Sequence, residues 1–331
     1  MYQVGSFCFD IRNPHHVPVP DNLKRFETEQ GMPEHLYRLT LVNHVEVKES
    51  EFMLNKDNMK VYVDEHVHKR YLFLKGDSRP YALCQKPIEH NATLVYVDAH
   101  YLPLFPADTI FGSILSLEKR MYFHNSFILH SAYICVNGRA VLFTAPSGGG
   151  KSTQAKLWAD HRGARTINGD RTLLCKEDGV YQACGWPICG SSQICYNEQY
   201  PLACIVVVIK GKENEVIELD YKQRVKKLIS ELTINYHYAD FVNAAMDFID
   251  ELAKSIKIYQ LTCDISEDAV RCLEERMRQD RLIAKEGRSM KKMKEFILRE
   301  VADEYILNSD RKDDRRIQRH HLADRDRRIH L

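Results

Sequence analysis

A glycine-rich run of nine residues, A-P-S-G-G-G-K-S-T at 145–153, constrains the fold of this 331-residue chain more than any other feature. The apolar segment R-A-V-L-F-T at 139–144 precedes it and is typical of a buried strand, whereas residues 151–161 have the pattern of an amphipathic helix. Glycines between a strand and a helix allow several backbone N–H groups to converge on one point. The run therefore predicts a strand, a loop and a helix, with an anion held at the start of the helix.

The run fits the phosphate-binding loop G-x-x-x-x-G-K-[ST], with Ala145 at the position of the first glycine. In such a loop Lys151 reaches the β- and γ-phosphates, and the Ser152 hydroxyl binds Mg²⁺. If Ala145 needs a left-handed backbone, its Cβ costs about 1–2 kcal/mol, which would weaken the loop without abolishing it. We expect ATP with Mg²⁺ as the ligand. The expected nucleotide-binding residues are Ser147, Gly148, Gly149, Gly150, Lys151, Ser152 and Thr153.

A phosphoryl-transfer site also needs a carboxylate that holds Mg²⁺ and orients an acceptor hydroxyl. Asp170 is the best candidate, because it follows a short strand expected at residues 164–167. A strand next to the loop would deliver its C-terminal end to the γ-phosphate. The alternative is an ordinary turn aspartate after Gly169.

The remaining pattern predicts an α/β domain around this loop. Asn137-Gly138 indicates a hairpin between strands at 127–136 and 139–144, and Gly163 suits the end of the helix that follows the loop. Further on, the sequence predicts helices at 221–234 and 241–256, a strand at 256–261 and a helix that begins after Ser266.

Residues 1–120 predict a β-rich N-terminal domain, with short alternating segments at 39–47, 60–63, 71–74 and 93–97. His66 and His68 would share one face of a strand, and without a third ligand nearby we expect them to be solvated. The ten cysteines include no C-x-x-C pair, so the densest group, Cys184, Cys189 and Cys195, is expected to consist of small core residues.

Composition limits the classes of partner. The 47 basic and 46 acidic side chains nearly cancel, so no overall charge favours nucleic acid or an anionic membrane. The most apolar run, residues 203–209, is too short to cross a bilayer, and the first ten residues lack the pattern of a secretory signal. We expect a soluble cytoplasmic protein without a nucleic-acid or membrane partner; a homo-oligomer is compatible with the sequence.

An ABC-type transport ATPase would carry a similar loop, but two of its features are missing. No L-S-G-G-Q signature follows, and the strand that ends at Ile209 continues as K-G-K without an acidic pair. A carboxykinase would need further basic and metal-binding groups, and the chain shows no such cluster.

The segment L-H-S-A-Y-I-C-V-N-G-R-A-V-L-F-T-A-P-S-G-G-G-K-S-T, followed by R-G-A-R-T-I-N-G-D-R-T-L-L, resembles the catalytic domain of HPr serine kinase/phosphorylase. That fold is shared with ATP-dependent phosphoenolpyruvate carboxykinase. The chain resembles more closely the HPr-kinase-like proteins encoded beside peptide-modification genes, over about residues 125–280. The resemblance implies a P-loop domain at 121–282, with a mixed sheet and an antiparallel hairpin, after the β-rich domain at 1–120.

The resemblance also implies site residues. Asp170 would be the metal-side and catalytic carboxylate, His130 a histidine close to it, and Lys151 the catalytic lysine of the loop. Residues 190–192 (G-S-S) fall where the family has a glycine turn near the phosphates. HPr kinase has two consecutive acidic residues where this chain has Gly169-Asp170, so one family carboxylate is missing.

We therefore expect a kinase that transfers the γ-phosphate of ATP to a serine hydroxyl of a peptide, protein or small molecule. HPr itself is not the expected acceptor. The alternative is a catalytically weak or inactive nucleotide-binding accessory protein for peptide modification.

The C-terminal part contains a second resemblance. Residues 296–307 are similar to the opening of a PqqD-like peptide-binding domain, which assigns residues 283–308 to a truncated segment of that kind. Residues 309–331 are charge-dense with few apolar side chains and are expected to be disordered. We expect a truncation or a change of reading frame near Ser309.

Overall fold

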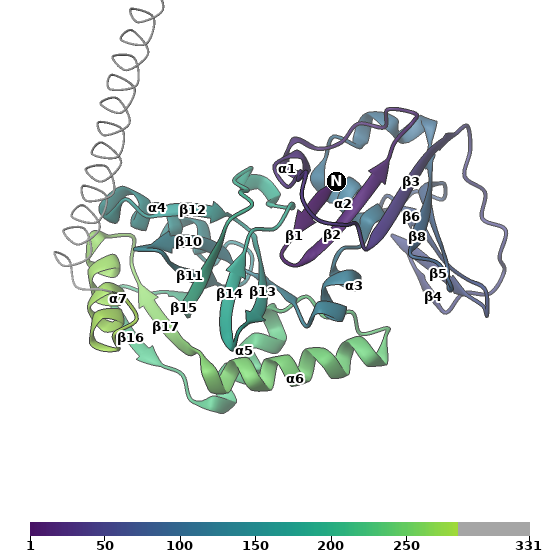
Figure 1. Cartoon of the computed structure of the whole chain (residues 1–331). Coiled ribbons are helices and arrows are strands. Elements are labelled where there is room, and N and C mark those ends of the chain that lie inside the picture. Colours follow the sequence, from purple (N-terminus) through teal and green to yellow (C-terminus); the bar gives the residue numbers. More distant parts are fainter. Residues whose placement is uncertain (284–331) are drawn as a thin grey trace, which may run out of the picture. The chain divides into compact units, whose positions relative to one another are not determined.

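The computed structural model describes residues 1–283 (Figure 1). Contacts group Met1–Leu282 into one compact unit with two β-sheets and helices, so the molecule is a mixed α/β protein. The PqqD-like segment and the charged tail expected from the sequence lie outside the described residues, apart from Ile283. No helix within residues 1–283 is long and apolar enough to cross a bilayer.

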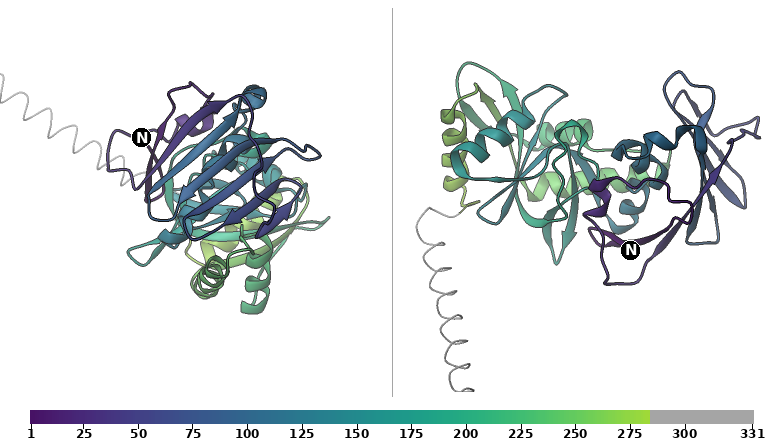
Figure 2. Two further views of the ribbon diagram at one scale, coloured as in Figure 1. Left: turned by 90° about the vertical axis from the view of Figure 1, so that its right-hand side faces the viewer. Right: turned by 90° about the horizontal axis from the view of Figure 1, so that it is seen from above.

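The first sheet has eight strands in the order β1-β2-β3-β8-β7-β6-β5-β4, and the left view of Figure 2 looks onto it. Its strands are β1 (Tyr2–Val4), β2 (Phe7–Arg12), β3 (His35–Val42), β4 (Leu54–Lys56), β5 (Met59–Val63), β6 (Val67–Phe73), β7 (Pro80–Pro87) and β8 (Ala92–Asp98). The pairs β2/β3 and β3/β8 are parallel and the others antiparallel. The strands expected at 60–63 and 93–97 lie in β5 and β8, and the one expected at 71–74 overlaps β6, which ends at Phe73. The strand expected at 39–47 starts earlier, at His35, and ends at Val42.

Short helices accompany this sheet and lead to the second one. They are α1 (Asp21–Lys24), η1 (Ala99–Leu104), α2 (Asp108–Leu115), α3 (Glu118–Met121) and η2 (Tyr122–His124). Of the two histidines expected to be solvated, His68 contradicts the expectation. Its Nε2 lies 2.8 Å from the Tyr238 hydroxyl, and burial lowers the pKa of His68 to about 3.

The second sheet has nine strands, in the order β12-β10-β11-β15-β14-β13-β9, with β17 beside β15 and β16 beside β17. Its strands are β9 (Phe127–His130), β10 (Ala132–Val136), β11 (Arg139–Thr144), β12 (Arg165–Asn168), β13 (Arg171–Glu177), β14 (Val180–Cys184), β15 (Gln199–Lys210), β16 (Glu215–Glu218) and β17 (Lys257–Cys263). It is a mixed sheet, because β15 runs parallel to β11 and β17 and antiparallel to β14.

The predicted hairpin is confirmed. Strands β10 and β11 pair antiparallel, and Asn137 and Gly138 have φ angles of 51° and 72°, as this tight turn requires. The single strand expected at 127–136 is wrong, because it divides at Ser131. The Ser131 N–H donates to the carbonyl oxygen of Asp170 (3.0 Å), while β9 pairs with β13 and β10 pairs with β11 and β12.

Helices cover both faces of the second sheet (Figures 1 and 2). Leu142 of β11 packs in the core with α5 (Tyr221–Glu231) and α6 (Ala239–Ser255), whereas the ring of its neighbour Phe143 lies beside Trp158 of α4 (Lys151–Arg162). Adjacent residues of a strand face opposite sides, so these helices lie on opposite faces. Helix α7 (Glu267–Gln279) contacts α4.

The core of the first sheet extends into the second part of the chain. Aromatic and aliphatic side chains of β2, β3 and α2 form one buried cluster with Leu173, Trp186 and several cysteines. These include Cys184, Cys189 and Cys195, which confirms their expected place in the core.

Candidate active site

The glycine-rich loop connects the end of β11 to the first residue of α4, and its glycines have specific conformational tasks. Gly148 and Gly150 have φ angles of 72° and 107°, where other residues are strained. A Cβ at Gly149 would lie 2.6 Å from the Ala145 Cβ and 2.8 Å from the Pro146 carbonyl oxygen. The loop conformation therefore depends on three consecutive glycines, as a close approach of backbone to an anion requires.

Ala145 differs from the expectation drawn from the phosphate-loop pattern. Its φ angle is not positive, so the predicted cost of a left-handed alanine does not arise. Its side chain is 1% exposed and packs under Gly149. An alanine therefore fits this position without backbone strain.

Lys151 begins α4 and is only 7% exposed. Its Nζ donates to the Ala145 carbonyl oxygen at 2.8 Å. Burial lowers the pKa of Lys151, and the carboxylates of Asp170 and Glu231 partly oppose that change. The ammonium group thus lies beneath the loop, within the electrostatic influence of two carboxylates.

A cavity of about 240 Å³ adjoins the loop. All of the residues predicted to bind nucleotide or catalyse transfer line it. They are His130, Ser147, Gly148, Gly149, Gly150, Lys151, Ser152, Thr153 and Asp170, and Gly169, Cys189 and Ser192 complete the lining. The structure therefore brings the predicted residues together, although their roles remain predictions.

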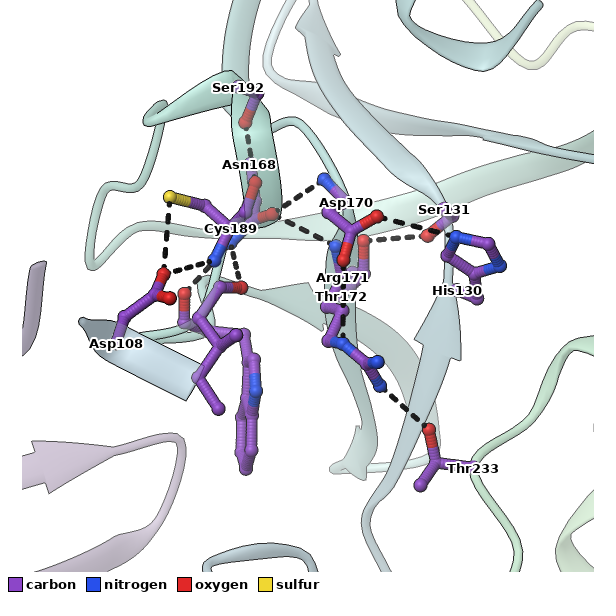
Figure 3. Close-up of polar contacts among 12 residues, drawn as sticks. Asp108, His130, Ser131, Asn168, Asp170, Arg171, Thr172, Cys189, Ser192 and Thr233 are labelled. Carbon is purple, nitrogen blue, oxygen red and sulfur yellow. Dashed lines mark hydrogen bonds and ion pairs between the residues drawn. The ribbon is translucent and has the colours of Figure 1, made fainter. Parts of the chain in front are cut away.

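Asp170 lies in the turn between β12 and β13, and the buried amide of Asn168 shapes that turn (Figure 3). The Asn168 Oδ1 accepts the N–H groups of Asp170 and Arg171, both at 2.9 Å. Its Nδ2 donates to the carbonyl oxygens of Trp186 and Ile188. The sequence predicted that the strand before Asp170 lies next to the strand that leads into the loop. That prediction is wrong, because β10 lies between β12 and β11 in the sheet.

His130, the last residue of β9, lies between two carboxylates. Its Nε2 is 3.3 Å from Asp170 Oδ1, and its Nδ1 is 3.4 Å from Glu231 Oε2. The hydrogen bond with His130 lowers the pKa of Asp170; burial opposes this, and the charges of Arg171 and Lys151 add to it. Asp170 is therefore held in its ionised form.

Glu231 was not predicted from the sequence. The helix expected at 221–234 would have continued past it, but α5 ends at Glu231 because the chain then pairs with β9. Leu232 forms a bridge with Leu129, and the Thr233 N–H donates to the Ile128 carbonyl oxygen at 2.8 Å. No local pattern signals this pairing, which brings the Glu231 carboxylate to His130.

The turn that contains Gly190 and Ser192 lies against Asp170. A Cβ at Gly169 would overlap the Ser192 side chain, whose Oγ donates to the Cys189 carbonyl oxygen at 2.7 Å. Asp108 of α2 holds the same turn, because its Oδ2 accepts the Cys189 N–H at 3.1 Å (Figure 3). The position where the resembling family has its second acidic residue therefore has no room for a side chain here.

These features define an α/β protein with mixed sheets and a cavity between a glycine-rich loop and an ionised aspartate. The model of the family "SynChlorMet cassette protein ScmC" matches residues 109–275, which is half of the chain. The chain belongs to this family.

The chain was also compared with solved structures and with curated proteins. Among solved structures, the HPr(Ser) kinase/phosphatase from Coxiella burnetii is similar over 47% of this chain and 96% of that chain, with 12% identity and a TM-score of 0.29. At that TM-score the likeness does not establish a shared fold. No curated protein matches the chain.

Proposed function

We propose that this protein is a kinase that binds ATP with Mg²⁺ and transfers the γ-phosphate to a serine hydroxyl of a peptide, protein or small molecule. The observation that carries the proposal is the shared cavity, which is lined by the glycine-rich loop with Lys151 and also by Asp170 and His130. A loop that holds phosphates and a carboxylate that orients a hydroxyl are the two parts that phosphoryl transfer requires.

The residues fit a triphosphate and its cation. The glycines leave the approach to the loop free of side chains, and α4 adds the partial positive charge of its N-terminus. The exposed Ser152 hydroxyl and the Asp170 carboxylate are oxygen donors of the kind that Mg²⁺ prefers. Within residues 1–283 no three His, Cys, Asp or Glu side chains form a metal cluster, but Mg²⁺ bound with a nucleotide needs only one or two protein ligands.

The transfer itself follows from this arrangement. The serine oxygen forms a bond to the γ-phosphorus while the bond from that phosphorus to the β,γ-bridging oxygen breaks, and ADP leaves. Asp170 orients the serine hydroxyl and takes its proton, while Lys151 stabilises charge on the transferred group; bound Mg²⁺ supplies further neutralisation there. His130 contacts one oxygen of Asp170 and thereby fixes the orientation of the carboxylate.

The name of the family refers to a cassette, which supports a role beside other proteins encoded in one gene cluster. We propose a serine-containing peptide of such a cluster as the first acceptor to test. Because ATP is the donor, we place the activity in the cytoplasm.

A second candidate is a nucleotide-binding accessory protein with little turnover. The observation that favours it is Gly169, where Ser192 fills the space of a second carboxylate. Glu231 is the only other carboxylate in contact with His130 among the described residues, and it lies on the other nitrogen of the ring.

Transfer of label from γ-labelled ATP separates the two candidates. We would compare wild type with Lys151→Ala and Asp170→Asn, and use Lys156→Ala, an exposed lysine of the same helix, as the matched control. A kinase transfers label to serine-containing acceptors in wild type and the control but in neither site variant. ATP binding that Lys151→Ala abolishes, without any transfer by wild type, would instead identify the accessory protein.

A further inference from the structure

A second cavity of about 240 Å³ lies between the first sheet and the start of α6, and none of its lining residues belongs to the cavity at the glycine loop. Strands β6 and β7 contribute Arg70 and Lys86, and helix α3 contributes Lys119 and Arg120. Four basic side chains thus line one small space. No Asp or Glu is among the lining residues.

No ion pair within residues 1–283 joins these four side chains to a carboxylate, although the charge of Glu118 acts on Lys119. Arg70 donates to the carbonyl oxygens of Ser113 and Ile114, at the C-terminal end of α2. Arg120 lies 3.3 Å from His35 Nε2, and Lys119 lies 3.4 Å from His68 Nε2. The described part of the chain therefore supplies no direct ion pair to these four side chains.

Of the four side chains, Lys119 has the environment that most disfavours its charged form. Its Nζ lies 3.5 Å from the centre of the Tyr238 ring. Burial lowers the pKa of Lys119 to about 6; Arg70 and Arg120 lower it further, and Glu118 opposes them. An amine that is buried among cations costs stability, and an anion in the cavity would relieve that cost.

The rest of the wall is aromatic. Tyr238 and Phe241 line the cavity from the start of α6, and Phe123 of η2 lies at its edge with 69% of its surface exposed. A large exposed aromatic side chain beside a concave surface marks a place where an apolar group can be covered. The volume is below the range of about 300–1,000 Å³ that is usual for drug-sized ligands, so a body of about one aromatic ring fits.

We propose that this cavity binds a small organic acid, whose carboxylate pairs with Lys119 and the neighbouring cations and whose aromatic body lies against Phe123, Tyr238 and Phe241. The proposal does not depend on the kinase activity proposed for the other cavity. The carboxylate can belong to a free acid or to the C-terminus of a peptide that ends in an aromatic residue, and the binding experiment distinguishes these sources.

Isothermal titration of the full chain with 3-phenylpropionate tests the proposal. We expect a Kd on the order of 1 mM or tighter, as a fragment of this size allows. Neutral 3-phenylpropan-1-ol, which has the same body, and propionate, which has the same charge, should each bind at least about tenfold more weakly. Equal affinities for the acid and the alcohol would overturn the proposal. Absence of binding by the acid at about 10 mM, tenfold above the expected Kd, would also overturn it.

Two peptides identify the source of the carboxylate. N-acetyl-glycyl-phenylalanine binds more tightly than 3-phenylpropionate if the site receives a peptide C-terminus, and its C-terminal amide then binds weakly. Tighter binding of 3-phenylpropionate assigns the site to free acids. Both results support an organic-acid site, whereas binding of the peptide acid and its amide with equal affinities at least as tight as that of 3-phenylpropionate contradicts it.

The variant Lys119→Met tests the assigned residue. It removes the charge, keeps a side chain of similar length, and should weaken 3-phenylpropionate binding by about tenfold or more. Lys212→Met, at an exposed lysine after β15, is the control and should bind as wild type does. A thermal unfolding transition like that of wild type checks that Lys119→Met is folded. Unchanged binding by the folded variant would refute the role of Lys119.

Discussion

At the scale of single residues, the candidate active site depends on one histidine held by two carboxylates. His130 contacts Asp170 from the turn after β12 and Glu231 from the end of α5. The imidazole thereby connects two elements that are far apart in the chain. Its contact with Asp170 also has a measurable electrostatic consequence.

The variant His130→Gln should raise the pKa of Asp170, because the hydrogen bond from His130 is the largest cause of its lowered value. Titration of the Asp170 carboxyl by carbon-13 NMR measures the change. In wild type the lowered pKa means that ionised Asp170 stabilises the fold above its usual pKa, and this contribution is lost as the pH falls through the folded value. The contribution should be smaller in the variant.

A matched histidine on the surface controls for general effects of the substitution. His161 of α4 lies near Glu267, away from Asp170, and His161→Gln should leave the Asp170 titration unchanged. An unchanged titration in His130→Gln itself would show that Arg171 and Lys151 account for the lowered pKa.

Lys119 makes a prediction about pH in the other cavity. Since its pKa is about 6 in the free protein, binding of a carboxylate above that pH requires uptake of a proton. The affinity for 3-phenylpropionate should therefore fall as the pH rises from 6, by up to about tenfold per unit, until the pKa of the bound state is reached. Titrations in buffers of different ionisation enthalpy report the proton uptake, and a flat profile between pH 6 and 9 would contradict it.

At the scale of elements, the turn that contains Gly190 and Ser192 fits closely against the turn that contains Gly169 and Asp170. The variant Gly169→Ala should lower the free energy of unfolding by about 1–3 kcal/mol, because its Cβ would overlap Ser192. Chemical denaturation measures the loss. Ser192→Gly should remove most of the additional cost in the double variant, and a strictly additive cycle would show that the two turns are not in contact.

Local sequence pattern predicts those elements whose causes are local. Asn and Gly are the residues that best tolerate the left-handed backbone of a two-residue hairpin turn, so the hairpin could be predicted from Asn137-Gly138. The glycines of the phosphate loop likewise indicated a loop before a helix. The break at Ser131 could not be found, because it depends on the carbonyl group of Asp170 in a distant turn. Glu231 could not be predicted for the same reason, since its helix ends there only because the following residues pair with β9.

The same distinction applies to the backbone cost that was expected at Ala145 if its position needs a left-handed conformation. The loop pattern states which residue types are usual, and it led to an expected backbone cost. The φ angle of Ala145 depends on how the whole loop is closed, and that angle is not positive. Residue type alone could not decide this question.

At the scale of the whole molecule, the two sheets share a core. Leu173, Trp186 and Cys195 belong to the buried cluster that includes Phe9 and Phe111 of the N-terminal part. The domain boundary at residue 120 remains a prediction, but a chain that begins at residue 121 would expose one side of this cluster.

We therefore expect a chain of residues 121–331 to lose its fixed tertiary packing. It should show weak near-ultraviolet circular dichroism and bind a hydrophobic dye, because apolar side chains of the shared core are left in water. The full-length chain is the reference. A sharp thermal transition and a native near-ultraviolet spectrum in the shortened chain would show that residues 121–331 fold independently.

The shared core also has a consequence during synthesis on the ribosome. The first sheet and its helices are complete once His124 is made, but Cys195, which closes the same cluster, follows roughly 70 residues later. At about 5–20 residues per second, the nascent chain waits about 4–14 s with an apolar face uncovered. A chaperone that binds exposed apolar surface would therefore act on this chain mainly during that interval.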